Sequence, residues 1–510
     1  MNSNNRHLLS QELASFCRKK GILYQSSELY GGVSGVWDYG HIGTLLKKNF
    51  QKEWIKYFKA LHDNFYEIQT GQIMHERVFK ASGHLEHFYD PIVEIDGEDT
   101  TYRADHLIEE KLDMRAEGLS IDEMKDLIVS KKLLGEVDYS KVQVNKLNMM
   151  FDVYMGPKRG ARAYLRPETA QSPFVNFKTQ FELQRKKLPM GLMLLGRVYR
   201  NEISPRNLNL RAREFEQAEL QIFFNPNTLN EKHFKFDEIK SLKVPVKLVN
   251  STSEDEIEYK SVEELLEYGI HEMYVYYLAR VFLFYRDTLK LDSNLRFLEL
   301  DEQERAFYNK MHFDIEMKMN SLNKWTEIGG VHYRTNHDLS SHEKESGVSM
   351  TIQDEARQEK VLPHVLELSF GLGRHIYSII DQTTQINTEN NQTTMHMSPK
   401  LSPITVAVLP LMNKEHLTQV AQELKNQFVE EDIEVVIETS GSIGKRYARQ
   451  DEIGTPFCIT IDYETIEEGA NKDTITIRNR DTAEQRRIKI DEAVEIIKKL
   501  VKGKISFEEL

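Results

Sequence analysis

Cysteine is nearly missing from this sequence, and its scarcity excludes two kinds of protein. The 510 residues include two cysteines, Cys17 and Cys458, which lie far apart along the chain. Two cysteines exclude a disulfide framework and a zinc site built from cysteine alone. We therefore expect no zinc in this protein.

Long apolar segments are missing as well. No uninterrupted apolar run approaches the ~18 residues that a membrane-spanning helix needs, and the N-terminal segment lacks the apolar core of a secretory signal. We expect a cytoplasmic protein without a membrane partner. The net charge of −13 also disfavours indiscriminate nucleic-acid binding. A specific RNA partner would need a local cluster of Lys and Arg.

The length indicates two or three domains, and the most informative stretch runs from Gly191 to Phe224. It reads as two β-strands joined by a polar loop over residues 204–211. The side chains of the second strand alternate, and in the first strand Arg200 and Glu202 point the same way. Because buried charge must be paired or liganded, the polar face predicts a site that grips a nucleotide. The apolar face carries Ala218, Leu220, Ile222 and Phe224, and the polar face carries Phe215, Gln217, Glu219 and Gln221.

Residues 200–202 (RNE), a loop, and residues 213–215 (REF) resemble motif 2 of the class II aminoacyl-tRNA synthetases. The continuation FEQAE, residues 215–219, resembles the glycyl branch of that family. The residue types suit the ATP site that this resemblance implies. Arg200 can fork two N–H bonds onto the α-phosphate, Phe215 offers a flat face to the purine, and Glu202 can accept from its exocyclic amine. Taken alone, the stretch could instead be an amphipathic strand pair with surface charges.

Residues 166–171, RPETAQ, match a signature of the same branch. Proline biases Arg166 toward an extended backbone and can open a helix, which puts Glu168 at a helix start. There Glu168 would complement the helix dipole, and the resemblance assigns it to the ammonium group of the amino acid. Arg103 falls where relatives place a substrate-contacting arginine, a residue type that beside an acidic helix usually forms a surface ion pair.

Two more short strands carry the rest of the resemblance. In WTEIGG, residues 325–330, charge and family position assign Glu327 to Mg²⁺ and ATP, because Mg²⁺ prefers carboxylate and phosphate oxygens. In residues 365–370, alternation puts Glu367 and Ser369 on one face. The GLGR that follows opens a helix and resembles motif 3. Its Arg374 would add positive charge where the γ-phosphate or adenine must sit.

The resemblance therefore implies three overlapping sets of site residues. Arg200 and Arg374 are the implied catalytic residues, and Glu327 is the implied magnesium ligand. The implied ATP site comprises Arg200, Asn201, Glu202, Leu210, Arg213, Phe215, Glu327, Ile328, Gly371, Leu372, Gly373 and Arg374. The implied glycine site comprises Arg103, Glu168, Phe215, Gln217, Glu219, Glu367 and Ser369.

A helix is predicted at residues 8–20, and a longer one follows from His41. Apolar residues recur along the longer helix every three or four positions. Its position resembles motif 1, through which class II synthetases dimerise, so the resemblance implies a homodimer. The strand after it, residues 73–78, lacks the proline usual in the family, and such a stripe also suits an intramolecular core. The glycine-rich residues 27–40 resemble a further signature, which suggests a place beside the active site. The stripe consists of Leu46, Phe50, Trp54, Phe58 and Leu61.

The predicted fold is an α+β catalytic domain with an antiparallel sheet over residues 1–380, the class II synthetase fold. Two insertions are expected, a charged and mostly helical one at about 97–150 and one at 226–312 that is helical in its second half. Residues 381–402, rich in Gln, Asn and Thr, read as a linker. Residues 403–510 resemble an α/β anticodon-binding domain.

Alternating strands and helices in that last domain predict a small, largely parallel sheet. Its GSIGK segment, residues 441–445, has the wrong glycine spacing for a P-loop. A basic cluster would supply the positive charge that a tRNA partner needs. The cluster comprises Lys445, Arg446, Arg449, Arg478, Arg480, Arg486 and Arg487.

The resemblance implies a ligase that activates glycine with ATP and Mg²⁺ and transfers it to the 3′ end of tRNA(Gly). The chemistry needs no Ser, Cys or His nucleophile, because positioning and charge neutralisation can carry it. One alternative is a non-catalytic nucleic-acid-binding relative, like the synthetase-like accessory subunits of DNA polymerases, which would be expected to lose the catalytic charges. Another is a class IIa synthetase for threonine, proline or histidine, which RPETAQ and FEQAE together disfavour.

Overall fold

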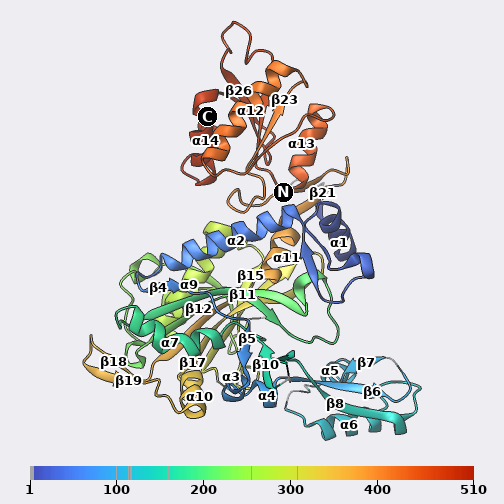
Figure 1. Ribbon diagram of the computed structural model, residues 1–510, viewed down its shortest axis with the longest axis vertical. Coiled ribbons are helices and arrows are strands. Elements are labelled where there is room, and N and C mark those ends of the chain that lie inside the picture. The colour runs from blue at the N-terminus through green and yellow to red at the C-terminus, as the bar shows by residue number, and fades with distance from the viewer. Residues whose placement is uncertain are drawn as a thin grey trace.

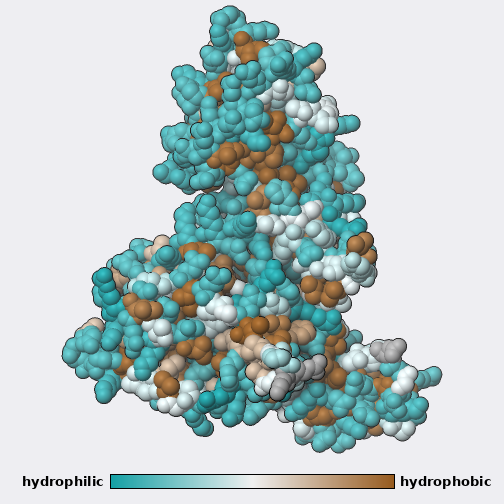
Figure 2. Space-filling model, viewed as in Figure 1, coloured by the Kyte–Doolittle hydropathy of each residue, from teal (hydrophilic) through white to brown (hydrophobic). Residues whose placement is uncertain are grey.

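Figure 1 shows a large body built around one sheet, a small lobe at the lower right, and a separate C-terminal body at the top. In the part of the chain that the structure describes, no helix is both long and apolar enough to cross a membrane. The face shown in Figure 2 is mostly hydrophilic, with hydrophobic residues in separate patches. This computed structural model describes residues 5–98, 100–112, 114, 116, 118–157, 160–253, 256–306 and 308–510.

The large body is organised by a nine-stranded sheet. Neighbouring strands run antiparallel except in two pairs, at one edge and within the second insertion, which confirms the predicted antiparallel sheet. In spatial order the strands are β14 (Glu258–Ser261), β13 (Lys243–Lys247), β15 (Leu295–Glu299), β16 (Met311–Met319), β17 (Lys324–Thr335), β20 (His364–Gly371), β12 (Glu214–Phe224), β11 (Met190–Tyr199) and β4 (Phe65–Glu67).

The alternation predicted for β12 is confirmed. Ala218, Leu220 and Ile222 are fully buried on one face of the sheet. Within the sheet β12 lies between β11 and β20, and on the other face the register pairs Glu219 with Ser369 and Gln221 with Glu367. The polar faces of two predicted strands therefore meet in space although 150 residues separate them in sequence.

Helices α2 (His41–Lys59), α9 (Glu272–Leu283) and α11 (Leu372–Thr383) cover the apolar face (Figure 1). The apolar stripe of α2 lies in this core, where the rings of Trp54 and Phe58 are 5.8 and 5.2 Å from the ring of Phe370. The stripe is thus intramolecular. Helices α7 (Gln171–Leu183) and α10 (His337–Ser346) lie against the opposite face, beside the polar residues.

The N-terminal segment contains the predicted helix, α1 (Ser10–Lys19), and a hairpin of β2 (Leu23–Gln25) and β3 (Trp37–Tyr39). A Cβ on Gly43, in the first turn of α2, would lie 1.9 Å from the carbonyl oxygen of Ile22, so glycine allows the hairpin to dock on the helix. The glycine-rich residues 27–40 lie against the loop between β11 and β12, because the amide of Arg213 donates to the carbonyl of Gly35 (2.7 Å).

The first insertion is not mostly helical, so that prediction is wrong. It is the lobe at the lower right of Figure 1, where a three-stranded sheet carries two helices on one face. Its central strand begins before residue 97, and its short alternating strands give a weaker signal than the charged helices between them. Residues 99, 113, 115 and 117 lie outside the described residues. The elements are β6 (Tyr89–Ile95), β7 (Thr101–Arg103), β8 (Val142–Asn148), α5 (Ala104–Leu112) and α6 (Ile121–Ser130).

Two other segments also differ from expectation. The second insertion has the predicted helix in α9, yet its strands β13, β14 and β15 extend the central sheet, so it is part of the body. The segment 381–402 is not an aperiodic linker. Its strands β21 (Thr384–Asn387) and β22 (Thr393–Met395) form a sheet with β1 (Asn5–His7). The partner strand lies at the other end of the sequence, so local composition could not indicate the pairing.

The C-terminal body contains the strands and helices predicted for it. Its sheet is mixed rather than largely parallel, because β23 pairs in parallel with β24 and β25 while the last two pairings are antiparallel. The strands are β24 (Val435–Ile437), β23 (Val406–Pro410), β25 (Phe457–Ile461), β26 (Thr474–Asn479) and β27 (Gln485–Lys489), and the helices are α12 (Glu415–Glu430), α13 (Ile443–Glu452) and α14 (Ala493–Val501).

Most arginines of the predicted basic cluster have partners inside this body. Arg446 is buried and donates to the carbonyls of Pro410, Leu411 and Glu438. Three others pair with aspartates at 2.8 to 2.9 Å, Arg478 with Asp451, Arg480 with Asp481 and Arg487 with Asp462. Their positive charge is therefore largely neutralised within the fold. Lys445 is exposed, so the usable positive surface is smaller than the sequence implied.

Candidate active site

One cavity contains both predicted catalytic arginines, and we call it the arginine cavity. It lies between the polar end of β12, the start of α11 and strand β17. Arg200 and Arg374 thus come from separate segments and face one space. The lining residues are Arg200, Glu202, Asn209, Leu210, Arg211, Ala212, Phe215, Gln217, Glu327, Ile328, Gly329, Gly330, His332, Ser369, Gly371, Gly373 and Arg374.

Arg200 follows the end of β11 and is fixed by its surroundings. Its Nε donates to the carbonyl of Pro167 (2.9 Å), and its guanidinium carbon lies 5.4 and 5.3 Å from the ring centroids of Phe88 and Phe215. No carboxylate among the described residues pairs with it. The guanidinium therefore keeps N–H groups for an anion in the cavity.

Arg374 is the third residue of α11 and ties two walls of the cavity together. Its Nη1 lies 2.9 Å from a carboxylate oxygen of Glu327 on β17, and its Nε donates to the carbonyl of Leu210 (3.2 Å). The Glu327 side chain is 51% exposed. This pair is solvent-screened and can be exchanged for a phosphate at little cost.

Sequence reasoning missed Arg211, which also lines the cavity. Its Nε donates to Glu202 (2.6 Å), and its guanidinium lies 3.8 Å from Asp90. The signal available was its place in the same loop, four residues before Phe215. Arg213 lies elsewhere, because it donates to the carbonyls of Glu202 and Ser34.

The other two residues predicted for ATP but not lining the cavity have internal contacts. Leu372 is buried in the core of the sheet. Asn201 donates its amide N–H to the carbonyl of Met149 (2.7 Å). Arg103, predicted for the amino acid, lies in the first insertion and pairs with Asp105 and, at 2.8 Å, with Asp90.

Beside the cavity lies a buried cluster of carboxylates, Glu168, Glu219, Glu367 and Asp338, which we call the acidic pocket. Gln221 donates to both Glu219 (3.3 Å) and Glu367 (2.7 Å), and Ser369 donates to Glu219 (3.0 Å). These contacts come from the facing polar sides of β12 and β20.

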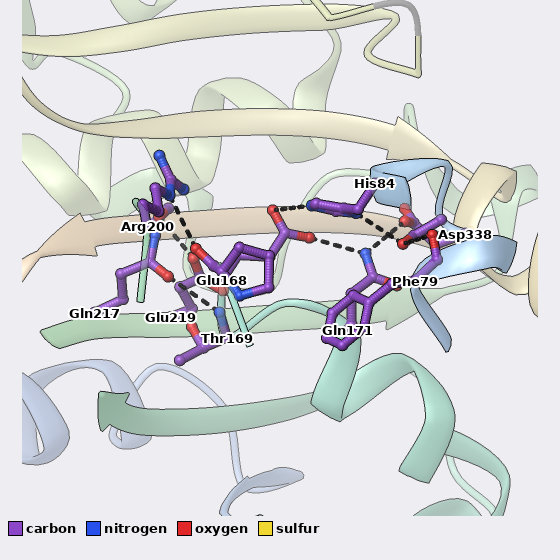
Figure 3. Close-up of polar contacts among 12 residues, drawn as sticks. Phe79, His84, Glu168, Thr169, Gln171, Arg200, Gln217, Glu219 and Asp338 are labelled. Atoms are coloured by element: carbon purple, nitrogen blue, oxygen red, sulfur yellow. Dashed lines mark hydrogen bonds and ion pairs between the residues drawn. The ribbon is translucent and has the colours of Figure 1, made fainter. Parts of the chain in front are cut away.

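Glu168 joins the pocket from the turn just before α7. Figure 3 shows its two carboxylate oxygens held from different sides, by Gln171 (2.8 Å) and by His84 (3.6 Å). Gln171 also reaches Asp338 (3.4 Å), and Gln217 accepts from the amide of Thr169 (3.0 Å). Apart from Arg103 and Phe215, the residues predicted to bind the substrate glycine are thereby brought to one place. Phe215 lines the arginine cavity beside Arg200.

Arg334 is the buried cation of the acidic pocket, and sequence reasoning missed it. It is 3% exposed and lies 2.8 Å from Asp338 and 3.3 Å from Glu367. Burial lowers the pKa of the neighbouring His332 well below its usual range, so this imidazole is neutral. One guanidinium against several carboxylates leaves an excess of negative charge away from water.

That excess is visible in the carboxylate pKa values. Burial, followed by the neighbouring Glu367, raises the pKa of Glu219 to about 8. Burial likewise raises the pKa of Glu367. Burial also disfavours ionised Glu168, yet His84, Arg334 and Gln171 outweigh it and hold the Glu168 pKa below its usual range. The pocket is therefore built to receive a cation, because a charge buried in low dielectric needs a partner.

Strand β16 brings two more carboxylates near Glu327, which lines the arginine cavity. Glu316 and Glu327 are cross-strand partners on β16 and β17, and Asp314 is near both. Burial, opposed by His312 and reinforced by Glu327, raises the pKa of Asp314. Glu316 is paired with Arg296 (2.7 Å), which leaves Glu327 and Asp314 as oxygen donors of the kind that a hard divalent cation takes.

Comparison with known proteins agrees with this geometry. The family model for the tRNA synthetase class II core domain (G, H, P, S and T) matches residues 154–383, and the model for an anticodon binding domain matches residues 405–500. Among solved structures, prolyl-tRNA synthetase from Cryptosporidium parvum, complexed with L-proline and AMP, superposes with a TM-score of 0.58. It is 12% identical, covers 97% of this chain and 76% of its own, and shows the fold. The chain is therefore a class II aminoacyl-tRNA synthetase.

Closer relatives define the branch. Glycine–tRNA ligase of Pyrococcus abyssi is 35% identical over 96% of this chain and 98% of its own length. Glycine–tRNA ligase of Treponema denticola is 35% identical over 98% of both chains. The chain belongs to the glycine–tRNA ligase family.

Proposed function

We propose that the protein activates glycine with ATP to glycyl-adenylate and transfers the glycyl group to the 3′ end of tRNA(Gly). One observation carries this proposal. A buried excess of carboxylates, the acidic pocket, adjoins a cavity that presents Arg200, Arg211 and Arg374. An amino acid is a cation at its ammonium end, and ATP is an anion along its phosphates, so the two substrates complement the two halves of the site.

The acidic pocket binds the ammonium group. Glu219 and Glu367 both accept from Gln221, and Glu168 presents its carboxylate from the other side. A substrate ammonium supplies the positive charge that Arg334 alone does not. Ionised carboxylates that accept charge-assisted hydrogen bonds hold it more strongly than neutral groups would.

The arginine cavity binds ATP and promotes the first step. Phe215 stacks on the adenine, and Arg200 holds the α-phosphate. Arg211 breaks its ion pair with Glu202, and Arg374 breaks its ion pair with Glu327. Both guanidinium groups then bind the outer phosphates. The glycine carboxylate oxygen attacks the α-phosphorus and pyrophosphate leaves, with charge stabilisation and positioning as the protein's contribution. In the second step the 3′-OH of the tRNA attacks the carbonyl carbon and AMP leaves.

Glu327 and Asp314 would hold the Mg²⁺ that accompanies ATP. The ion would neutralise phosphate charge as pyrophosphate departs. The pairing of Glu327 with Arg374, which we propose for the outer phosphates, supports this role.

The site selects glycine by excluding larger amino acids rather than by binding a side chain. Crowded carboxylates and Ser369 around the ammonium group leave no room for a substituent at Cα. Overfilling a packed site by a methyl group costs about 1–3 kcal/mol, which corresponds to roughly 5- to 150-fold discrimination against alanine.

The C-terminal body would bind the anticodon end of tRNA(Gly), and we propose that the active form is a cytoplasmic homodimer. The α2 stripe is used inside the fold, so a dimer interface must use other surfaces. Static light scattering of the purified protein tests the dimer.

ATP–pyrophosphate exchange across the twenty amino acids tests the proposed activity. We expect exchange with glycine, weak exchange with alanine and none above background with the rest. Comparable exchange with alanine would overturn the steric account. Preference for threonine, proline or histidine would overturn the assignment of glycine, and absence of exchange with every amino acid would favour a non-catalytic relative.

A further inference from the structure

The first insertion is joined to the catalytic body by residues 84–90 and 148–150, which we call the neck. The neck lies directly on the active site. The amide of Met149 donates to the carbonyl of Phe88 (3.2 Å), and the carbonyl of Met149 accepts from Asn201 (2.7 Å), beside Arg200. Both chain segments of the neck are thus fastened to each other and to the loop that carries the catalytic arginine.

Three neck residues contact three parts of the site in chain order. His84, in α4 (His84–His87), lies 3.6 Å from Glu168 of the acidic pocket. The ring of Phe88 lies 5.4 Å from the guanidinium carbon of Arg200. Asp90 lies 3.8 Å from Arg211 at the far end of the arginine cavity. A connection to a peripheral lobe does not require such contacts.

His84 is held so that one ring atom faces the acidic pocket. Its Nδ1 lies 2.7 Å from the hydroxyl of Ser82, and its ring makes edge contacts with Phe79 (5.9 Å) and Phe88 (5.3 Å). The side chain is 13% exposed. Figure 3 shows the ring directed at one oxygen of Glu168 while Gln171 holds the other. The orientation of the carboxylate is thereby fixed from two sides.

Phe88 contacts Arg200 from the neck, as His84 contacts Glu168. The guanidinium lies between the rings of Phe88 and Phe215, and its Nε is bonded to Pro167. Cation–π contacts are stronger when the arginine is partly desolvated. The neck thus supplies one of the two aromatic faces that orient the group proposed for the α-phosphate.

We propose that the neck is a positioning element of the active site, in which His84 orients Glu168 for the ammonium group and Phe88 orients Arg200 for the α-phosphate. The inference rests on the proposed function for the roles of Glu168 and Arg200. His84 and Phe88 are positioning residues, because they act through those two side chains. Small displacements of such groups cost rate, since reacting atoms must be held in near-attack geometry.

ATP–pyrophosphate exchange with His84→Ala tests the first contact. We expect the glycine KM to rise about 10-fold, as for loss of a contact to a charged group, while the ATP KM stays unchanged. His84→Gln can still present an N–H near Glu168 and should restore most of the affinity. His87→Ala is the matched control, because His87 lies in the same helix, is 71% exposed and pairs with exposed Glu86. It should match wild type.

Phe88→Leu tests the second contact. This variant keeps apolar bulk against His84 and loses the ring face toward Arg200, so we expect kcat to fall about 10-fold while the glycine KM changes much less. The matched control is Tyr89→Leu, which removes the ring under Lys146 (4.0 Å) in the adjacent position. Equal losses in the two variants would overturn a specific role for Phe88.

The double variant His84→Ala/Glu168→Gln separates positioning from general damage. If His84 acts through Glu168, the double variant has the glycine KM of Glu168→Gln alone. Additive increases would overturn the inference. So would a loss in His84→Ala that His84→Gln does not restore and that accompanies a lower thermal midpoint. A normal glycine KM in Glu168→Gln itself would instead overturn the proposed function, whatever His84 does.

Discussion

The two halves of the active site handle charge in opposite ways. In the acidic pocket Glu219, Glu367 and Asp338 are all at most 4% exposed, and one guanidinium, Arg334, pairs with Glu367 and Asp338. In the arginine cavity the side chains of Arg374 and Glu327 are 33% and 51% exposed and pair with each other. One half holds more carboxylates away from water than its single guanidinium can pair, and the other holds charges that solvent already screens.

This difference explains how a small substrate can be bound tightly. Glycine offers few atoms, so its ammonium group must meet strong electrostatics in a dry pocket, where each interaction is worth more than in water. ATP offers many atoms and brings its own counterion, so an accessible cavity with exchangeable ion pairs suffices. Effects of substitution on stability should therefore concentrate in the acidic pocket, and effects on rate in the arginine cavity.

Removing the cation of the acidic pocket should have the largest effect on stability. Arg334→Met leaves Glu367 and Asp338 without their buried cation, which typically costs about 3–5 kcal/mol. The apparent free energy of unfolding in urea measures this. Arg77→Met is the control, since Arg77 is 57% exposed and pairs with Glu345, and should cost less than about 1 kcal/mol. Equal losses of stability in the two variants would contradict the difference between buried and solvent-screened charge.

Removing a cation from the arginine cavity should instead affect rate. Arg200→Ala deletes a donor to the α-phosphate, and we expect kcat of ATP–pyrophosphate exchange to fall by about 10²–10³ with little change in thermal midpoint. Arg197→Ala, on the strand β11 that precedes Arg200, is the control, because Arg197 is 55% exposed and pairs with Glu214. A loss below about 5-fold in Arg200→Ala would contradict the proposed role.

Glu219→Gln should separate binding from stability within the acidic pocket. The folded-state pKa of Glu219, about 8, exceeds its ordinary value of 4.5, so the folded protein binds this proton more tightly than the unfolded chain. Wild-type stability therefore declines as pH rises from about 4.5 to about 8. The variant lacks this decline, so its advantage over wild type should grow across that window.

Glycine binding should show the opposite trend. In wild type the glycine KM should fall as pH rises toward 8 and Glu219 loses its proton, whereas the variant should show no such fall. At pH 8 its glycine KM should be about 10-fold higher, because a neutral amide replaces a charged acceptor. Thermal unfolding and exchange assays at pH 6 and 8 check both trends. A variant less stable than wild type at pH 8 would contradict this account.

Glu327→Gln tests the arginine cavity, the half of the site whose charges are screened by solvent. Breaking its pair with Arg374 should cost less than about 1 kcal/mol of stability, because the pair is solvent-screened. The Mg²⁺ concentration for half-maximal exchange should rise several-fold, since a carboxylate ligand becomes an amide. An unchanged Mg²⁺ requirement would mean that Asp314 or the phosphates alone hold the ion.

Much of this organisation could be predicted where it depends on local pattern. The period of two in β12 identified the lining side chains, and β20 repeated it with Glu367 and Ser369. What failed was long-range. Arg334 has no distinctive local context, and its role appears when β17 and β20 bring it beside Glu367. The contact of His84 with Glu168 likewise joins segments 84 residues apart.

Secondary structure failed for a related physical reason. The strand β1 becomes a strand because β21, near the other end of the chain, supplies its hydrogen-bonding partner. In the first insertion the helices carry visible charge patterns, whereas β6 and β8 show their alternation over few residues. In the C-terminal body the sequence overstated the positive charge available to RNA. Arg446 and Arg478 belong to the predicted basic cluster, yet both have partners inside the fold.

The smallest expected effect tests that last point. Lys445 is exposed at the start of α13, whereas Arg478 is paired with Asp451. If Lys445 contacts a tRNA phosphate, Lys445→Ala should raise the tRNA KM about 2- to 5-fold and lower the slope of log affinity against log salt by about 1. Glycine-dependent exchange without tRNA should be unchanged, because the acidic pocket and arginine cavity are untouched. Arg478→Gln should instead lower the thermal midpoint, since it leaves buried Asp451 unpaired. A salt slope that changes in neither variant would place the tRNA contacts of this body on another face.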